Sequence, residues 1–201
     1  MDHIEELARA LAKLPGIGPR QGKRFVYYLL SAPADERKRL SELVASLGKD
    51  VHQCSECLRF YNGSSTATIC NYCSDKTRDD SILMLVEKDQ DLSAVERAGT
   101  YKGRYFVLGG VLTLSGKGAI REKELLKTVE KRLKNNLKEL VLALSATSEG
   151  EHTTDRIRDL LAPYRDHLKI SELGRGLATG SELEYSDAET LRAALTNRKE
   201  T

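Results

Sequence analysis

Features that would place this 201-residue chain in a membrane or on a secretory route are missing. No stretch of eighteen apolar residues occurs, which excludes a membrane-spanning helix. The first thirty residues begin with acidic side chains and contain no apolar segment of the secretory type. Bases and acids nearly balance, at 32 and 30, so the net charge indicates no particular partner. With no low-complexity segment or repeat either, we expect a cytoplasmic protein with reduced thiols.

Four cysteines form two Cys-x-x-Cys pairs with twelve residues between them: Cys54, Cys57, Cys70 and Cys73. Each pair places two sulfurs on one side of a turn, and two pairs complete a tetrahedron around Zn²⁺ with Zn–S bonds of about 2.3 Å. Two disulfides are the alternative, but they require an oxidising compartment. The spacing therefore predicts a structural zinc site with no position open to a substrate.

The first 53 residues have the apolar periodicity of helices. Apolar side chains recur every three or four residues from Ile4 to Leu14, and a Pro-Gly-Ile-Gly-Pro turn follows. Pro19 suits the first position of a second helix, over 19–30. A third helix is predicted over 34–48, with one face formed by Leu40, Leu43, Val44 and Leu47.

The turn between the first two helices lies in a basic segment. Five bases and no acid occur from Leu7 to Ala34. Arg20 shares a helix face with Lys23 or Arg24, and the helix N-terminus beside the turn can accept a phosphate oxygen. This pattern is typical of sequence-independent nucleic-acid binding. The alternative is a tight helix connection with solvated bases.

From residue 81 the chain alternates apolar strands with amphipathic helices, which predicts a parallel sheet covered on both faces. A closing helix is expected to start at Ser186, with Glu189 completing a capping box. The predicted strands are 82–86, 104–108, 140–144 and 168–173, and the helices between them are 92–98, 122–135 and 154–164.

Three carboxylates follow two of these strands. Glu87 comes directly after the strand 82–86, and Glu149 and Glu151 follow the strand 140–144, with Gly150 allowing a tight turn. Ligands of parallel sheets bind beyond the carboxyl ends of the strands, so these acids could line one crevice and hold Mg²⁺ for a nuclease, topoisomerase or primase. Ordinary surface acids are the alternative. The segment 114–118 departs from the phosphate-loop pattern, which argues against nucleotide hydrolysis.

Several segments in this order resemble the bacterial RecR recombination mediator family. They are LPGIGP at 14–19, the four-cysteine segment with Arg78-Asp79, VEKDQDLSAVERAG at 86–99, YFVLGG at 105–110, SEGEHTT at 148–154 and LGRGLATGSELEYSDAETL at 173–191. The resemblance implies an α/β protein with a helix-hairpin-helix DNA-binding head, a four-cysteine zinc finger, a Toprim-like parallel-sheet domain and a C-terminal segment with a closing helix. The ranges expected for these parts are 1–53, 54–80, 81–175 and 176–201.

The resemblance also implies a function. Members form homo-oligomers, either dimers or ring-shaped tetramers, that clamp DNA without sequence preference. With RecO and RecF they help load the RecA recombinase at gaps and breaks, in the cytoplasm and at the nucleoid. Arg20 and Arg24, with Lys23 beside them, match the DNA-contacting positions. Glu87, Glu149 and Glu151 match Toprim acidic positions that serve partner binding, chiefly of RecO, without strand cleavage.

Two departures from the family pattern stand out. The gap between the cysteine pairs predicts a small insertion around 62–67, whose closure cost rises only logarithmically with length. Glu149-x-Glu151 replaces the Asp-x-Asp of Toprim enzymes, and the longer side chains fit the strict geometry of Mg²⁺ less well. We therefore expect a non-enzymatic protein with structural zinc. A Mg²⁺-dependent Toprim nuclease or primase-like enzyme is the alternative, and an adaptor that binds only proteins is a third possibility.

Overall fold

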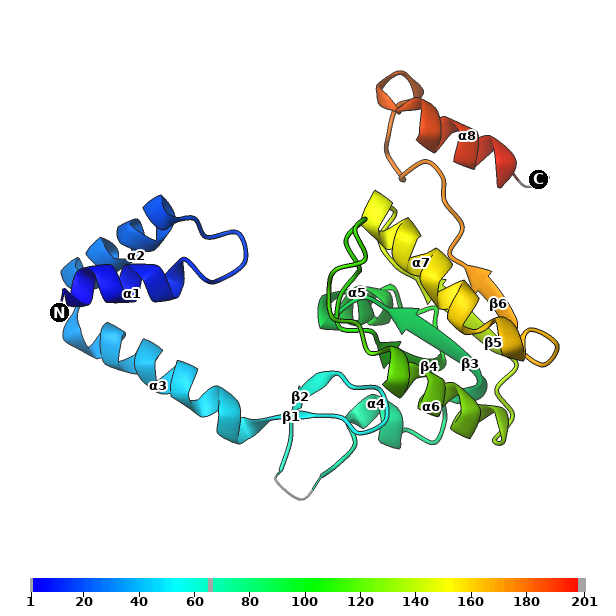
Figure 1. Cartoon of the computed structure of the whole chain (residues 1–201), viewed down its shortest axis with the longest axis horizontal. Helices are drawn as coiled ribbons and strands as arrows, with labels where there is room; N and C mark the ends of the chain where they lie inside the picture. Colours follow the sequence, from blue (N-terminus) through cyan, green and yellow to red (C-terminus); the bar gives the residue numbers. More distant parts are fainter. Residues whose placement is uncertain (1, 65–66, 199–201) are drawn as a thin grey trace. The chain divides into compact units, whose positions relative to one another are not determined.

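Three helices form the N-terminal head of the computed structural model, which describes residues 2–64 and 67–198 (Figure 1). They are α1 (His3–Leu11), α2 (Pro19–Ser31) and α3 (Ala34–Asp50). The predicted helix-hairpin-helix order is confirmed. The chain forms two units, one containing the residues up to His52 and the other containing Gln53–Tyr61 and most of the remaining chain.

Helices α1 and α2 pack closely because a glycine lies at their contact. A Cβ atom on Gly22 would lie 2.5 Å from the carbonyl oxygen of Ala8. Val26, one turn further along α2, is buried, and so is Ala8 on α1. Asp2 caps α1 by accepting hydrogen bonds from the backbone N–H groups of Ile4 and Glu5. The small side chains therefore set the distance between the two helices.

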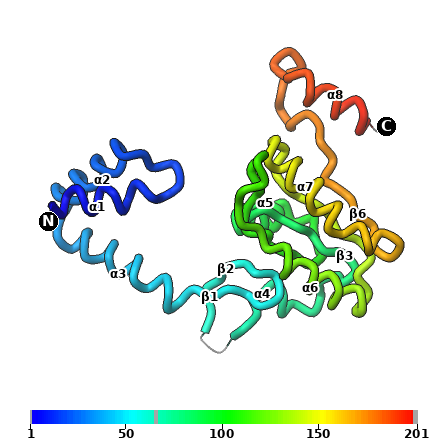
Figure 2. The backbone as a smooth tube through the Cα atoms, in the orientation of Figure 1, coloured from blue at the N-terminus to red at the C-terminus, as the bar shows by residue number. Residues whose placement is uncertain are grey.

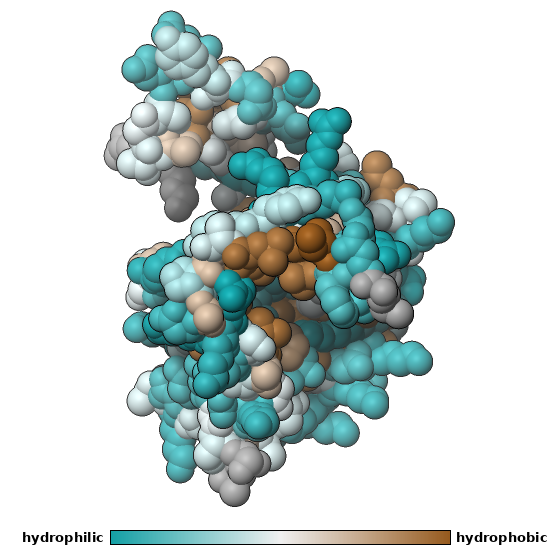
Figure 3. Space-filling view, turned by 90° about the vertical axis from the view of Figure 1, so that its left-hand side faces the viewer, coloured by the Kyte–Doolittle hydropathy of each residue, from teal (hydrophilic) through white to brown (hydrophobic). Residues whose placement is uncertain are grey.

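The third helix has an apolar face that the rest of the chain does not cover. Leu40, Leu43, Val44 and Leu47 are 46–62% exposed, and α3 has no buried residue. Other large apolar side chains of the head are exposed too, including Tyr27 at 60%. Hydrophobic side chains are also visible among hydrophilic ones on the face drawn in Figure 3. The apolar periodicity of α3 therefore predicted the helix but not a contact within this chain.

The cysteine segment contains little regular structure. Strands β1 (Val51–Gln53) and β2 (Phe60–Asn62) form a two-stranded sheet, and α4 (Asn71–Ser74) is a single turn. The expected insertion at 62–67 includes residues 65 and 66, which lie outside the described part of the chain.

A four-stranded parallel sheet in the order β4-β3-β5-β6 forms the centre of the α/β body, as predicted. The central strand β3 alternates its side chains between two cores. Leu83 and Leu85 pack with residues of α6 and α7, whereas Met84 and Val86 pack with Leu92 of α5 and with three of the cysteines. The strands are β3 (Asp79–Val86), β4 (Gly103–Val107), β5 (Glu139–Ala143) and β6 (Lys169–Glu172), and the helices are α5 (Asp89–Ala98), α6 (Glu122–Leu133) and α7 (Ser148–Leu160).

Three predicted helix starts are wrong. Helix α5 begins at Asp89, three residues earlier than the predicted 92, and the Asp91 carboxylate caps it by accepting a hydrogen bond from the Lys88 N–H group. Helix α7 begins at Ser148, six residues earlier than the predicted 154, because the Thr147 side chain caps it by accepting a hydrogen bond from the Gly150 N–H group. Helix α8 (Ala188–Thr196) is capped by Asp187, whose carboxylate accepts from the N–H groups of Glu189 and Thr190, so Ser186 forms no capping box. A connection that contains the short 3-10 helix η2 (Leu183–Tyr185) joins β6 to α8 (Figure 2). No helix in the described ranges is long and apolar enough to cross a membrane.

Candidate functional site

The four cysteines converge as predicted. Their Sγ atoms all lie within 4.8 Å of one another, and three of the four residues are fully buried. The sulfurs of Cys57 and Cys70 are 3.6 Å apart, too far for a disulfide bond of about 2.05 Å. The backbone N–H group of Cys70 donates a hydrogen bond to the Cys54 sulfur. Four convergent free thiols without another ligand type match the donor set of a closed tetrahedral zinc site.

Crowding changes the acidity of these thiols. Hydrogen bonds from Cys57, Cys70 and Cys73 lower the pKa of Cys54. The hydrogen bond to Cys54, together with burial, raises the pKa of Cys57. The four groups therefore do not ionise together unaided. A bound divalent cation would supply the positive charge that lets all four act as thiolate ligands.

Hydrogen bonds fix the cysteine segment to strand β4. The Val107 N–H group donates to the carbonyl oxygen of Cys57 at 2.8 Å. The Arg104 guanidinium donates to the carbonyl oxygens of Tyr72 and Cys73 at 2.9 and 3.1 Å. Arg121 donates to the carbonyl oxygens of Leu58 and Val107. Backbone groups in both knuckles therefore have partners in the α/β body.

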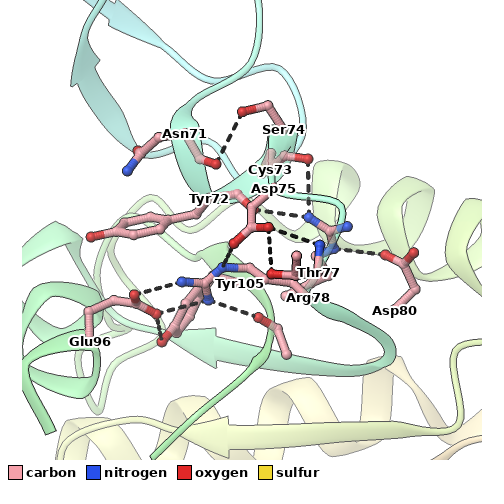
Figure 4. Close-up of polar contacts among 12 residues, drawn as sticks. Asn71, Tyr72, Cys73, Ser74, Asp75, Thr77, Arg78, Asp80, Glu96 and Tyr105 are labelled. Atoms are coloured by element: carbon pink, nitrogen blue, oxygen red, sulfur yellow. Dashed lines mark hydrogen bonds and ion pairs between the residues drawn. The ribbon is translucent and has the colours of Figure 1, made fainter. Parts of the chain in front are cut away.

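A largely buried ion pair provides a further link (Figure 4). Arg78 binds both carboxylate oxygens of Glu96 on α5, at 2.9 and 2.6 Å, and the Tyr105 hydroxyl donates to the same carboxylate. The Arg78 guanidinium lies 4.7 Å from the centre of the Tyr72 ring. Burial opposes the ionisation of Glu96, but the hydrogen bonds from Arg78 and Tyr105 prevail and hold its pKa below the ordinary value. The resemblance pointed to Arg78, whereas no sequence pattern singled out Glu96.

The predicted basic residues lie on α2, in the head. Arg20 and Arg24 are exposed and one helical turn apart, and neither guanidinium forms a hydrogen bond or ion pair within residues 2–64 and 67–198. Lys23 differs, because its ammonium group pairs with Glu5 at 2.6 Å. That contact raises the pKa of Lys23. Of the three predicted bases, the two arginines are therefore the ones without an ion pair among the described residues.

The hairpin before α2 presents backbone N–H groups. Gly16 has a φ of +77°, a left-handed conformation that favours glycine. Gly18 caps α2 without a side-chain hydrogen bond, and Pro19 occupies the first turn. The first N–H groups of α2 therefore have no capping side chain, as at helix ends that bind phosphate.

The three predicted acids do not form a metal-ligand cluster in the described part of the chain. In the described part of the chain, the cysteines are the one group of three or more ligand-type residues whose ligand atoms lie within 4.8 Å of one another. Glu87 is buried and pairs with Lys88 at 2.9 Å, whereas Glu151 is exposed and pairs with Arg175. Glu149 and Glu151 are two positions apart in the first turn of α7, and such positions point to different sides of a helix. The three carboxylates therefore form no metal-ligand cluster among the described residues, and their position along one crevice stays a prediction.

Gly150 has a role that the sequence did not reveal. It lies inside the first turn of α7, where a Cβ atom would be 1.9 Å from the carbonyl oxygen of Ser145. The missing side chain therefore allows α7 to approach the backbone of Ser145, which follows strand β5. Gly150 does not form the tight turn that was expected between the two glutamates.

The head, the α/β body and the C-terminal segment each match a known protein family. Models for three protein families match the chain: RecR, helix-hairpin-helix, at residues 4–47; Toprim domain, at residues 81–173; and RecR, C-terminal, at residues 176–199. Similar proteins include Recombination protein RecR of Bifidobacterium longum subsp. infantis, 37% identical over 98% of this chain and 96% of the relative. Recombination protein RecR of Myxococcus xanthus is 37% identical over 99% of this chain and 98% of the relative.

Proposed function

Because the chain belongs to the RecR family of recombination proteins, we propose that it binds DNA without sequence preference and mediates recombinational repair without catalysing a reaction. The observation that supports DNA binding best is the pair of exposed guanidinium groups of Arg20 and Arg24 beside the first turn of α2. Arginine side chains and helix N-termini contact phosphate oxygens and carry no base specificity. Lys23 lies on the same helix and contributes less in this proposal, because Glu5 neutralises it.

We further propose that several copies act together as a clamp. Heads from a dimer or a ring-shaped tetramer would hold one DNA molecule, and linked contacts raise the overall affinity without any new type of interaction. The exposed apolar face of α3 supports self-association, because monomeric proteins seldom leave such a face uncovered. RecO- and RecF-type proteins would be the partners with which the clamp loads RecA at gaps and breaks.

The cysteine site fits structural Zn²⁺ held by Cys54, Cys57, Cys70 and Cys73. The ion would supply the positive charge that keeps four thiolates together, and the chain supplies the hydrogen bonds that fix the knuckles on β4. This segment is too short to build a core alone. In this proposal, the zinc-bound segment connects the head to the body and fixes the direction in which the head leaves it.

Glu87, Glu149 and Glu151 serve partner binding in this proposal. A Mg²⁺-dependent Toprim nuclease or primase would need carboxylates whose oxygens converge on a cation. These three do not converge within ligand distance of one another. Glu151 and its ion pair with Arg175 remain accessible to a partner, because both side chains are partly exposed.

The experiment that tests the head compares Arg20→Ala/Arg24→Ala with the unaltered protein. Binding of a labelled DNA duplex would be followed by fluorescence anisotropy at several salt concentrations. Loss of two phosphate contacts reduces the steepness of log K against log salt by about 1.8 for each head that contacts the DNA, at about 0.9 per contact. Lys38→Ala/Arg39→Ala removes the same charge from α3 and serves as the matched control. Unchanged affinity of the Arg20/Arg24 variant at low salt would exclude the head as the DNA-binding surface.

A further inference from the structure

Helix α6 carries a row of lysines that none of the sites described above uses. Lys123, Lys127, Lys131 and Lys134 recur at intervals of four, four and three residues, which places them on one helix face. Successive members lie about 6 Å apart along the axis, and the row is about 16 Å long, at 1.5 Å per residue. Leu125 and Val129 on the opposite side are fully buried. The row therefore faces outward.

Most of these charges have no acidic partner. Lys123, Lys127 and Lys134 are exposed and form no ion pair with any residue in the described ranges, whereas Lys131 pairs with Glu56. Six bases and two acids occur from 123 to 138, in a chain whose net charge is only +2. One of those acids, Glu130, accepts a hydrogen bond from the Tyr164 hydroxyl. Helix α6 itself contains four bases and three acids, and Lys134 and Lys138 follow it, so the excess of positive charge lies in the lysine row and just after the helix.

Stability of the helix does not account for the row. Like charges four residues apart on a helix destabilise it, by a few tenths of a kcal/mol per pair. A protein interface does not account for it either, because such interfaces have an apolar centre and none of the large exposed apolar residues lies on α6. Evenly spaced ammonium groups on a polar face are typical of contacts to a phosphate backbone.

We propose that the lysine row of α6 is a second DNA-backbone contact surface, located on the α/β body and additional to the arginines of the head. The proposal rests on the proposed function in DNA binding. The row would contact phosphates through point charges, without reading bases. An acidic protein is the alternative partner of the lysine row. The test below distinguishes DNA from an acidic protein.

The test uses Lys123→Ala/Lys127→Ala/Lys134→Ala in the full-length protein. Alanine favours helix, so α6 is expected to stay folded, which circular dichroism checks. Binding of a labelled DNA duplex is measured by anisotropy at several salt concentrations. We expect the slope of log K against log salt to fall by about 2.7 for three lost contacts, and the affinity at low salt to fall on the order of tenfold or more.

Two controls make the result specific. Lys76→Ala/Lys102→Ala/Lys117→Ala removes the same charge from exposed positions elsewhere in the body, and it should bind DNA like the unaltered protein. An equal loss in this control would show an effect of net charge and would overturn the proposal. Arg20→Ala/Arg24→Ala is measured in parallel. If the head variant binds DNA weakly and the lysine-row variant binds it normally, the proposal for the lysine row is wrong and the proposal for the head stands. An acidic protein is then the expected partner of the lysine row. If only the row variant is weakened, the head proposal fails alone.

Discussion

Replacement of Glu96 by alanine should destabilise the α/β body and its cysteine segment together. The side chains of Arg78 and Glu96 are only 10% and 18% exposed, so the pair is largely withdrawn from water. Removal of one partner from a buried pair costs about 3–5 kcal/mol, because the other charge is left uncompensated. Arg78 keeps weaker contacts with Asp75 at 3.7 Å and with the carbonyl oxygen of Gly103. We therefore expect the lower part of that range, about 3 kcal/mol.

Glu96→Gln refines the same prediction. The amide keeps one oxygen that can accept from Arg78 but loses the charge, so a cost of about 1.5–3 kcal/mol is expected, the range for hydrogen bonds to charged groups. The loss of unfolding free energy in Glu96→Ala and in Glu96→Gln should be measurable by chemical unfolding of the zinc-loaded protein, followed by circular dichroism. In thermal unfolding they correspond to about 2–4 °C per kcal/mol for a chain of this size.

The pH dependence gives an independent check. The folded protein holds the pKa of Glu96 below its ordinary value, so the ionised carboxylate stabilises the fold. This contribution is fully present above the ordinary carboxyl pKa of about 4.3, and it is lost as the pH falls through the lower pKa of the folded state. The difference in the free energy of unfolding between Glu96→Gln and the unaltered protein should therefore be constant near neutral pH and become smaller in acid.

The control is Glu124→Ala, which removes an exposed carboxylate of α6 that has no partner side chain in the described ranges. It should change the free energy of unfolding by less than about 0.5 kcal/mol. If Glu96→Ala is as stable as this control, the ion pair does not hold the cysteine segment to the body and the reasoning is refuted.

Two further predictions concern the metal and the head. Cys54→Ser should lose bound zinc, measured by metal analysis, and should make the segment 54–80 sensitive to protease, because Cys54 is fully buried in the core that also contains Met84 and Tyr105; retention of stoichiometric zinc would contradict this. Gly22→Ala should separate α1 from α2, because its Cβ would lie 2.5 Å from the Ala8 carbonyl oxygen, and it should cost about 1–3 kcal/mol. Hydrogen exchange of α1 and α2 measures this, and Gly48→Ala on α3, with nothing within 4 Å, should cause no such loss.

The elements that local patterns specify were predictable. The cysteine spacing predicted a converging site, and the turn residues predicted the hairpin before α2. The β3 strand was recognisable because both of its faces are buried, which makes Ile82 to Val86 continuously apolar. Such signals depend on neighbours in the sequence.

The remaining features depend on contacts between distant segments. Gly150 lowers helix propensity, so the first turn of α7 looked like a loop, and only the approach of Ser145 explains the glycine. The same error hid that Glu149 and Glu151 lie in the first turn of α7. Glu96 is an ordinary acid of an amphipathic helix until Arg78 and Tyr105 are brought to it. The pairing of Lys23 with Glu5 likewise required the packing of α1 on α2.

The cysteine knuckle also protects an open edge of the sheet. Strand β4 is the last strand on its side, and edge strands present unpaired backbone groups to which another chain can add. The N–H group of Val107 is taken by the Cys57 carbonyl oxygen and its own carbonyl oxygen by Arg121. Removal of the metal would free the Val107 N–H group from its hydrogen bond to the Cys57 carbonyl oxygen. Aggregation through β-strand addition is then the expected fate of the metal-free chain, and metal supply would govern its solubility as well as its fold.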